Sequence, residues 1–225
     1  MGLRKLFYFY FLYMYISSSA LTIVIDPGHG GIFSGATSIN NKIIEKTIAL
    51  SLAQELMRVL QAEKHKVVLT RSTDTQLKDE LLDDLMARVD VARTVSADIF
   101  LSLHCNASVD AGVQGVELYV PYTDTGFPGQ SYMLASCVHA QLIKVVPALW
   151  TGNLGNLNKH DRGIRAARFN VLAHNPAPAA VLIEFDYLSN SQAESRLQDT
   201  VYQQQLINAL KSGILCYTQN TSTKK

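Results

Sequence analysis

Short apolar segments rich in β-branched residues alternate along this chain with longer segments of helical periodicity, and this alternation limits the possible folds more than any other feature. The segments with the length and composition of buried strands are Thr22 to Asp26, Lys66 to Thr70, Asp98 to His104, Val116 to Val120 and Ala179 to Phe185. Apolar residues three or four positions apart predict helices between Ile44 and Leu60, between Leu82 and Val95, from Tyr132 to Val146 and from Val201 to Tyr217. This order predicts an α/β fold with a mostly parallel, twisted sheet covered by helices on both faces.

The amino terminus has the layout of a secretory signal peptide. Arg4 and Lys5 precede an apolar run from Leu6 to Ile16, and small residues follow up to Ala20. The run is too short to span a bilayer comfortably. We therefore expect residues 1–20 to be a signal peptide that exports the protein to the periplasm or cell envelope, with no stable membrane association after cleavage. An uncleaved membrane anchor is the alternative.

The remaining chain, about 205 residues, suits one domain with a sizeable core. We expect this domain to span residues 21–219 and to be followed by a polar tail, residues 220–225. Without Arg4 and Lys5, the 20 basic residues fall to 18 against 19 acidic ones, a net charge near −1. Because the only basic run is the terminal Lys224-Lys225, the charge pattern gives no indication of a nucleic acid partner.

The chain has three cysteines, Cys105, Cys137 and Cys216, with no Cys-x-x-Cys pair. This pattern predicts neither a thiolate zinc site nor a disulfide framework, although one disulfide and one free thiol would be consistent with it. Cys105 follows His104 on a predicted strand, so its side chain points to the opposite face. We expect a small buried residue there rather than a nucleophile.

Three residues of types that bind zinc lie at the ends of predicted elements. His29 follows the first strand in a glycine-rich turn, Glu45 lies at the start of the first helix, and His104 ends the third strand. The carboxyl ends of parallel strands meet at one edge of a sheet, where open α/β folds bind ligands. Two histidines and one glutamate leave the fourth position of a tetrahedral zinc open to water. We predict one zinc ion per chain at this edge, although each residue alone could be purely structural.

Glu184 lies within the apolar run of the last predicted strand, between Ile183 and Phe185. A carboxylate in such a run is costly to bury unless it is paired or has a chemical use. Its strand ends at the same edge of the sheet, where zinc would lower the pKa of water from ~15.7 to ~7. Glu184 is therefore the leading candidate for moving protons, and a buried ion pair is the alternative.

Further motifs extend over the expected domain in a fixed order. They are Ile25 to Gly31, Gly35-Ala36 followed by Glu45-Lys46, Thr70-Arg71, Ala97 to Ala107, Gly115 to Tyr119, Asp161 to Ile164, and Ala180 to Glu184 with Ser189-Asn190. Through them the chain resembles the zinc-dependent N-acetylmuramoyl-L-alanine amidases of bacterial cell walls. The resemblance implies that His29, Glu45 and His104 bind zinc and that Glu184 is catalytic. It also implies that zinc-activated water cleaves the amide between N-acetylmuramic acid and the L-alanine of the peptidoglycan stem peptide.

The chain departs from this family pattern at two positions near the expected site. Phe33 stands where an acidic residue is usual, and Asp186 stands where glycine is usual, which would put a second carboxylate near Glu184. Asn106 is a candidate for an additional oxyanion donor. Between Tyr119 and Asp161 we expect one structural helix and a loop, with no second helix to plug the site. The enzyme would then be open without a protein activator, and no activator or recruiter is identified.

Two other functions remain open on the sequence alone. An inactive amidase fold could bind peptidoglycan without cleaving it, although the complete set of candidate site residues favours an enzyme. The stretch from Ser222 to Lys225 has the Ser-x-x-Lys spacing of serine-type enzymes that act on stem peptides. Those enzymes place this motif at the start of a packed helix, whereas here it ends the chain.

Overall fold

A computed structural model describes residues 20–123, 129–146 and 161–222 of the chain. The expected signal peptide therefore lies almost entirely outside the described residues, and so does the loop expected before Asp161. The elements in chain order are β1 Thr22–Pro27, α1 Glu45–Ala62, β2 Lys66–Leu69, α2 Leu81–Thr94, β3 Ile99–Asn106, β4 Val116–Pro121, α3 Gly129–Val145, β5 Asp161–Ala167, α4 Asn170–Ala173, β6 Ala179–Tyr187, α5 Ser191–Gln198 and α6 Thr200–Ser222.

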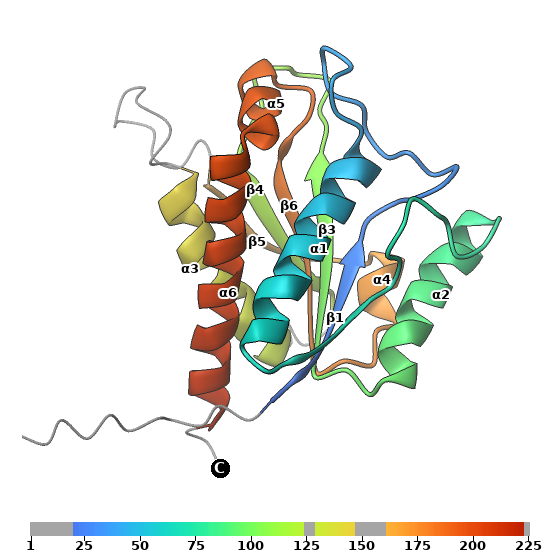
Figure 1. Ribbon diagram of the computed structural model, residues 1–225, viewed down its shortest axis with the longest axis vertical. Helices are drawn as coiled ribbons and strands as arrows, with labels where there is room; N and C mark the ends of the chain where they lie inside the picture. The colour runs from blue at the N-terminus through green and yellow to red at the C-terminus, as the bar shows by residue number, and fades with distance from the viewer. Residues whose placement is uncertain (1–19, 124–128, 147–160, 223–225) are drawn as a thin grey trace, which may run out of the picture.

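The strands form one six-stranded sheet in the order β2-β1-β3-β6-β4-β5 (Figure 1). All neighbouring strands run parallel except β4 and β6, which are antiparallel. The predicted mostly parallel sheet is therefore confirmed. Because β4 runs against β6, the amino end of β4 lies at the same sheet edge as the carboxyl ends of β1, β3 and β6.

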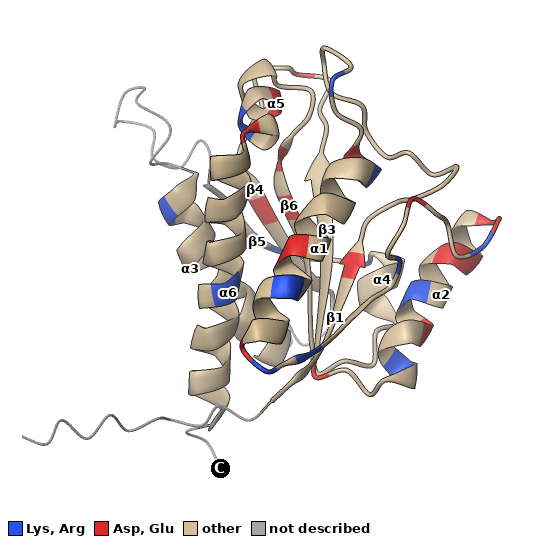
Figure 2. Ribbon diagram, in the orientation of Figure 1, with Lys and Arg blue, Asp and Glu red and all other residues tan. Residues whose placement is uncertain are grey.

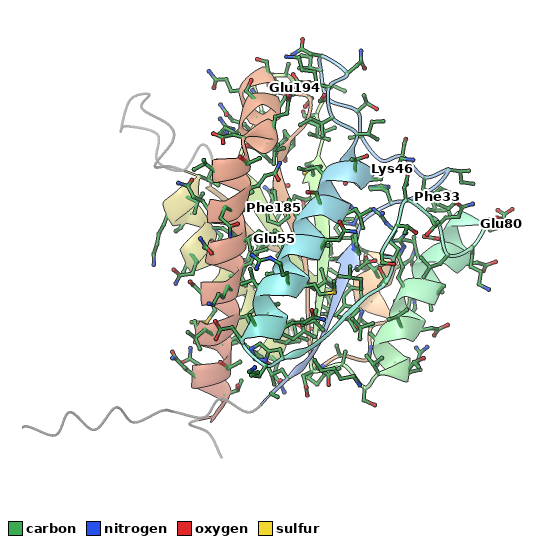
Figure 3. The ribbon with its side chains drawn as sticks, viewed as in Figure 1. Phe33, Lys46, Glu55, Glu80, Phe185 and Glu194 are labelled. Carbon is green, nitrogen blue, oxygen red and sulfur yellow. A yellow bond between two sulfur atoms is a disulfide. The ribbon has the colours of Figure 1, made fainter. Side chains whose placement is uncertain are left out.

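Helices cover both faces of the sheet, as predicted. On one face, the larger core cluster joins α1, α3 and α6 to the strands, and Phe185 of β6 is fully buried in this layer (Figure 3). On the other face, a smaller cluster joins α2 and α4 to the sheet through residues such as Val89 and Leu172. β1, β3 and β6 pack against helices on both sides, which explains why their sequences are almost continuously apolar.

Several elements differ from the sequence prediction: the short helices α4 and α5 and the strand β5 were not predicted, and α6 is longer than expected. β5 was not predicted, because its sequence, Asp-Arg-Gly-Ile-Arg-Ala-Ala, lacks an apolar run; among the described strands it pairs with β4 alone, at the edge of the sheet. α6 continues to Ser222, five residues beyond the expected end at Tyr217. The Ser-x-x-Lys spacing thus begins at the last residue of a helix rather than at the first.

Cys137 of α3 and Cys216 of α6 form a disulfide, with their Cα atoms 5.7 Å apart. Cys105 is a free thiol and is buried, which confirms the expectation for this residue. Among the described residues, no helix is both long enough and apolar enough to cross a membrane. Basic and acidic side chains lie side by side on the surface of α2 (Figure 2), where Arg93 and Asp90 form an ion pair.

Candidate metal centre

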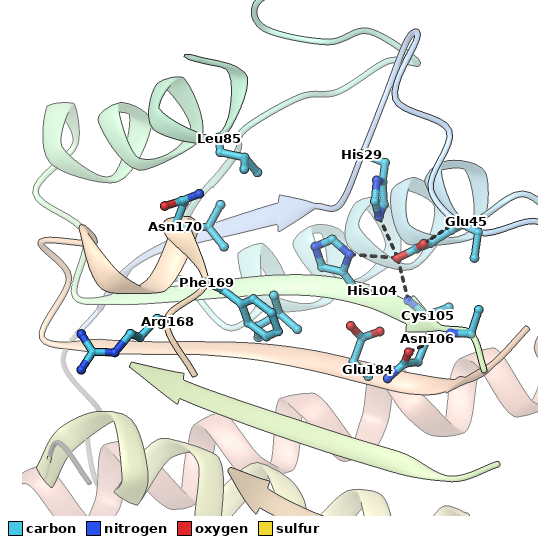
Figure 4. Close-up of a pocket in the computed structure, with 14 residues that line it drawn as sticks. His29, Glu45, Leu85, His104, Cys105, Asn106, Arg168, Phe169, Asn170 and Glu184 are labelled. Atoms are coloured by element: carbon cyan, nitrogen blue, oxygen red, sulfur yellow. Dashed lines mark hydrogen bonds and ion pairs between the residues drawn. The ribbon is translucent and has the colours of Figure 1, made fainter. Parts of the chain in front are cut away.

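The three residues predicted to bind a metal converge on one point (Figure 4). Oε1 of Glu45 lies 3.1 Å from Nε2 of His29 and 2.9 Å from Nδ1 of His104. One ligand atom from each residue lies within 4.8 Å of the other two. Two ligand atoms at about 2.0 Å from a tetrahedral zinc are themselves about 3.3 Å apart. The donor types and their spacing therefore fit a zinc ion that has three protein ligands.

Each ligand is placed by the end of an element. His29 follows β1 and has a φ of 62°, in the left-handed region that is uncommon for residues with a side chain. Glu45 is the first residue of α1, where the helix dipole favours a negative charge. Its Oε2 accepts a hydrogen bond from the backbone N–H of Ala36 (2.8 Å), and its Oε1 accepts one from Cys105 (3.1 Å). These bonds hold the carboxylate in place independently of the histidines.

The electrostatics of the cluster favour a cation. Burial by itself raises the pKa of Glu45, but hydrogen bonds from His104 and His29 outweigh burial and hold this pKa well below its usual range. Burial lowers the pKa of His104, yet the bond to Glu45 and the nearby charge of Glu184 leave it above the usual value. The raised pKa of His104 shows that the surrounding carboxylates favour a positive charge at this point, which a divalent ion would supply on binding.

Glu184 stands beside this cluster, as the sequence predicted. It lies on β6 directly opposite His104 of β3 in the parallel pairing. Its Oε2 is buried and has no hydrogen-bond partner in the described part of the chain. Burial raises the pKa of Glu184 to about 7; His104 opposes this rise, and the negative charges of Glu45 and Glu117 add to it. Such a carboxyl group can both accept and release a proton near neutral pH.

The second carboxylate expected near Glu184 is Glu117, not Asp186. Asp186 accepts a hydrogen bond from Arg196 of α5 at 2.6 Å and another from the backbone N–H of Gly115 at 2.8 Å. The pairing of β3 with β6 is irregular just before this point. A bulge of this kind reverses the alternation of side chains, so Asp186 lies toward α5 while Glu184 faces the cleft. Glu117 of β4 is 1% exposed and pairs across the strands with Glu184.

Asn106, the candidate oxyanion donor, already makes two hydrogen bonds within the protein. Its Nδ2 donates to Oε2 of Glu117 at 3.1 Å, and its Oδ1 accepts from the backbone N–H of Ala107 at 2.8 Å. Glu117 also accepts a hydrogen bond from the hydroxyl of Tyr119 at 2.9 Å. These bonds fix the orientation of the Asn106 amide and leave its second N–H for a ligand.

Two buried arginines hold the loop that carries His29: Arg71, which belongs to the Thr70-Arg71 motif, and Arg88, which no sequence motif included. Arg71 donates to the carbonyl oxygens of Pro27 (3.0 Å) and Gly28 (2.8 Å). Arg88 of α2 donates to the carbonyl oxygens of Pro27 (2.8 Å) and His29 (2.6 Å). A hydrogen bond to a backbone carbonyl does not depend on the identity of the accepting residue, so the sequence could not predict these contacts and only the folded structure shows them.

Replacing Gly28 by alanine is expected to lower the affinity for zinc by about 10- to 100-fold, as changes next to a metal ligand commonly do. A Cβ at this position would lie 2.2 Å from Cε1 of His104, so the imidazole would have to move. The same change at Gly129, where a Cβ has no heavy atom within 4 Å, is the control. Competition with a coloured chelator measures the affinity. Equal affinities in the two variants would contradict this account.

The cluster lies in an open cleft of about 530 Å³ that is bounded by both layers of the fold. Its polar side is formed by His29, Glu45, His104, Asn106 and Glu184. Its far side is formed by residues of α2, of the turn after β5 and of α4, namely Leu85, Arg168, Phe169, Asn170 and Val171 (Figure 4). The cleft is large enough to hold several residues of a peptide beside the metal centre.

Comparisons with known proteins agree with this geometry. Residues 23–216 match the family model described as N-acetylmuramoyl-L-alanine amidase. The N-acetylmuramoyl-L-alanine amidase LytC of Bacillus subtilis is 34% identical over 196 residues, which is 87% of this chain and 35% of LytC. The probable cell wall amidase LytH of Staphylococcus epidermidis is 33% identical over 87% of this chain and 58% of LytH. The chain thus spans about a third of one relative and just over half of the other.

Among solved structures, the catalytic domain of CwlV, an N-acetylmuramoyl-L-alanine amidase from Bacillus (Paenibacillus) polymyxa var. colistinus, superposes with a TM-score of 0.74. It is 34% identical in sequence, and the match covers 88% of this chain and 98% of that domain. The similarity therefore extends over the α/β layer structure of the catalytic domain. The chain belongs to the N-acetylmuramoyl-L-alanine amidase family.

Proposed function

We propose that this protein is a zinc-dependent amidase that cleaves the bond between the lactyl group of N-acetylmuramic acid and the L-alanine of the peptidoglycan stem peptide. The observation that carries the proposal is the buried carboxylate of Glu184, whose Oε2 finds no hydrogen-bond partner among the described residues, beside the His29, Glu45 and His104 cluster in an open cleft. An inactive binding protein would have no use for a buried carboxylate without a partner, because such a group destabilises the fold.

In the proposed reaction, different residues bind the metal and transfer the proton. His29, Glu45 and His104 would hold the zinc ion, which when bound supplies a Lewis acid and lowers the pKa of water to ~7. Glu184 takes a proton from the attacking water as its oxygen bonds to the lactyl carbonyl carbon. The same carboxyl group then delivers that proton to the alanine nitrogen as the carbon–nitrogen bond breaks. The products are a lactyl carboxylate and a stem peptide with a free amino terminus.

The place of action follows from the substrate. Peptidoglycan lies outside the cytoplasmic membrane, and relatives of this chain are named as cell wall amidases. The start of the chain supports export, since Arg4 and Lys5 followed by the run from Leu6 to Ile16 form the pattern of a signal peptide. We propose that the enzyme acts in the cell envelope on peptidoglycan or muropeptides. We further propose that its site is open without an activator.

Removal of the metal is expected to abolish hydrolysis, and zinc is expected to restore it. Purified protein is treated with a chelator, dialysed and divided into samples with and without added zinc. Mass spectrometry of muropeptide digests then follows the release of stem peptides with free L-alanine amino termini. A folded, zinc-loaded protein that leaves this amide intact in every muropeptide would refute the proposed activity and favour a role in binding alone.

A further inference from the structure

On the wall of the cleft, Oε2 of Glu184 is buried and has no hydrogen-bond partner in the described part of the chain. The side chain of Asn170, which also lines the cleft, makes no hydrogen bond with the described residues. The polar groups of the metal cluster bond to one another, and Asn106 bonds to Glu117 and Ala107. The backbone carbonyl of Asn170 accepts a hydrogen bond from the N–H of His174. Glu184 has a chemical role in the proposed reaction. The carboxamide of Asn170, which is half-buried in the cleft, has none so far.

Asn170 is held at its position by the elements around it. It is the first residue of α4, whose next two residues, Val171 and Leu172, are 4% and 1% exposed in the core between α2 and the sheet. On its other side, the ring of Phe169 packs edge to face against Tyr119, with ring centroids 5.1 Å apart. The backbone at Asn170 is therefore fixed, and Figure 4 shows its side chain across the cleft from Glu184.

The wall of the cleft that carries Asn170 also has apolar side chains. Leu85, Phe169, Val171 and Leu182 line the same cleft. A sugar ring carries a polar group on most of its carbon atoms and would bury several of them here without partners, which is unfavourable. An extended peptide with small side chains suits the space better, because its methyl groups can contact the apolar wall. Its backbone presents an amide at regular intervals.

A carboxamide matches a backbone amide in hydrogen bonding. The Nδ2 of asparagine donates and its Oδ1 accepts, so one side chain can pair with the C=O and N–H groups of a peptide. We propose that Asn170 binds a backbone amide of the stem peptide and thereby fixes how the peptide lies relative to Glu184. This inference rests on the proposed function, because it assumes that the stem peptide enters the cleft. It adds a residue through which kcat/KM would depend on the length of the stem peptide.

The test measures kcat/KM for a series of substrates that runs from N-acetylmuramoyl-L-alanine to N-acetylmuramoyl pentapeptide. Asn170→Leu keeps the approximate size of the side chain and removes both hydrogen-bonding groups. The ratio of wild-type to variant kcat/KM is expected to rise with stem length, to about tenfold once the peptide reaches residue 170. Asn208→Leu is the matched control, since Asn208 is exposed on α6, on the opposite face of the sheet. For Asn208→Leu, the ratio of wild-type to variant kcat/KM is expected to be the same at every stem length.

Two results would overturn the inference. An equal loss at every stem length would mean that Asn170 supports the fold or contacts the muramic acid, and no loss at any length would mean that it binds nothing. Calorimetry with the free pentapeptide tests the same contact without catalysis: affinity is expected to fall about tenfold in Asn170→Leu. A wild-type protein that binds the peptide through Asn170 but hydrolyses no substrate would refute the proposed function alone.

Discussion

Substitution of Glu184 by glutamine is expected to lower hydrolysis of the muramoyl–alanine amide by about 10²- to 10⁴-fold, the usual contribution of a general acid–base residue. Glutamine has nearly the same shape, but it can neither take the proton of the attacking water nor deliver one to the leaving nitrogen. The side chain does not belong to the His29, Glu45 and His104 cluster, so zinc content should remain close to one ion per chain. Single-turnover hydrolysis of a muropeptide, together with metal analysis, measures both quantities.

The matched control is Glu117→Gln. Glu117 is also a buried carboxylate and lies opposite Glu184 across the β4 and β6 strands, but it does not line the cleft. Glutamine at this position can still accept hydrogen bonds from Asn106 and Tyr119. We expect less than about a tenfold loss of rate, because the remaining acceptor keeps the neighbouring amide in place. If both variants lost activity equally, Glu184 would have no special part in proton transfer.

The sequence was sufficient to predict that the candidate ligands His29, Glu45 and His104 converge, because each lies at the end of an element. Strand ends are marked by a change from apolar residues to polar or glycine residues, and parallel topology brings such ends to one edge. His29, His104 and Glu184 follow this rule, and Glu45 does so through the crossover helix. The fold class could be predicted for the same reason, since buried parallel strands and amphipathic helices have distinct periodicities.

What the sequence could not show depends on long-range geometry. The direction of Asp186 follows from an irregularity in strand pairing, and nothing in the residues around it marks that irregularity. The antiparallel direction of β4, which brings Glu117 to the site, is set by the sheet as a whole. β5 has no apolar pattern and depends on its pairing with β4. Arg88 lies on the helix predicted between Leu82 and Val95, and nothing in the apolar periodicity of that helix shows that this charged residue is only 1% exposed.

Arg88→Met is expected to destabilise the protein by about 3–5 kcal/mol, the typical cost of removing one partner from a buried ion pair. Arg88 donates to Oδ1 of Asp26 at 2.9 Å and to Oδ2 of Asp84 at 2.7 Å, and both carboxylates are 1% exposed. Without the guanidinium, two buried negative charges lose their main counter-charge. The carbonyl of His29 also loses its donor, so zinc affinity is expected to fall. Denaturant unfolding of the metal-free variants measures the change in stability.

The acid dependence of this loss separates an electrostatic cause from a packing defect. Burial raises the pKa of Asp26, but Arg88 and hydrogen bonds from Thr70 and Ser102 lower it below the usual value overall. In the wild type, the stability that Asp26 contributes is therefore present above its unfolded-state pKa and is lost as the pH falls through its folded-state pKa. Without Arg88, the folded-state pKa of Asp26 rises. Protonation in acid then neutralises a buried carboxylate that has lost its counter-charge, so the difference in free energy of unfolding between wild type and variant should shrink below about pH 5.

The control is Arg93→Met, which breaks an exposed ion pair on the same helix and should cost less than about 1 kcal/mol. A pH-independent deficit in Arg88→Met would show that lost packing, rather than unpaired charge, is responsible.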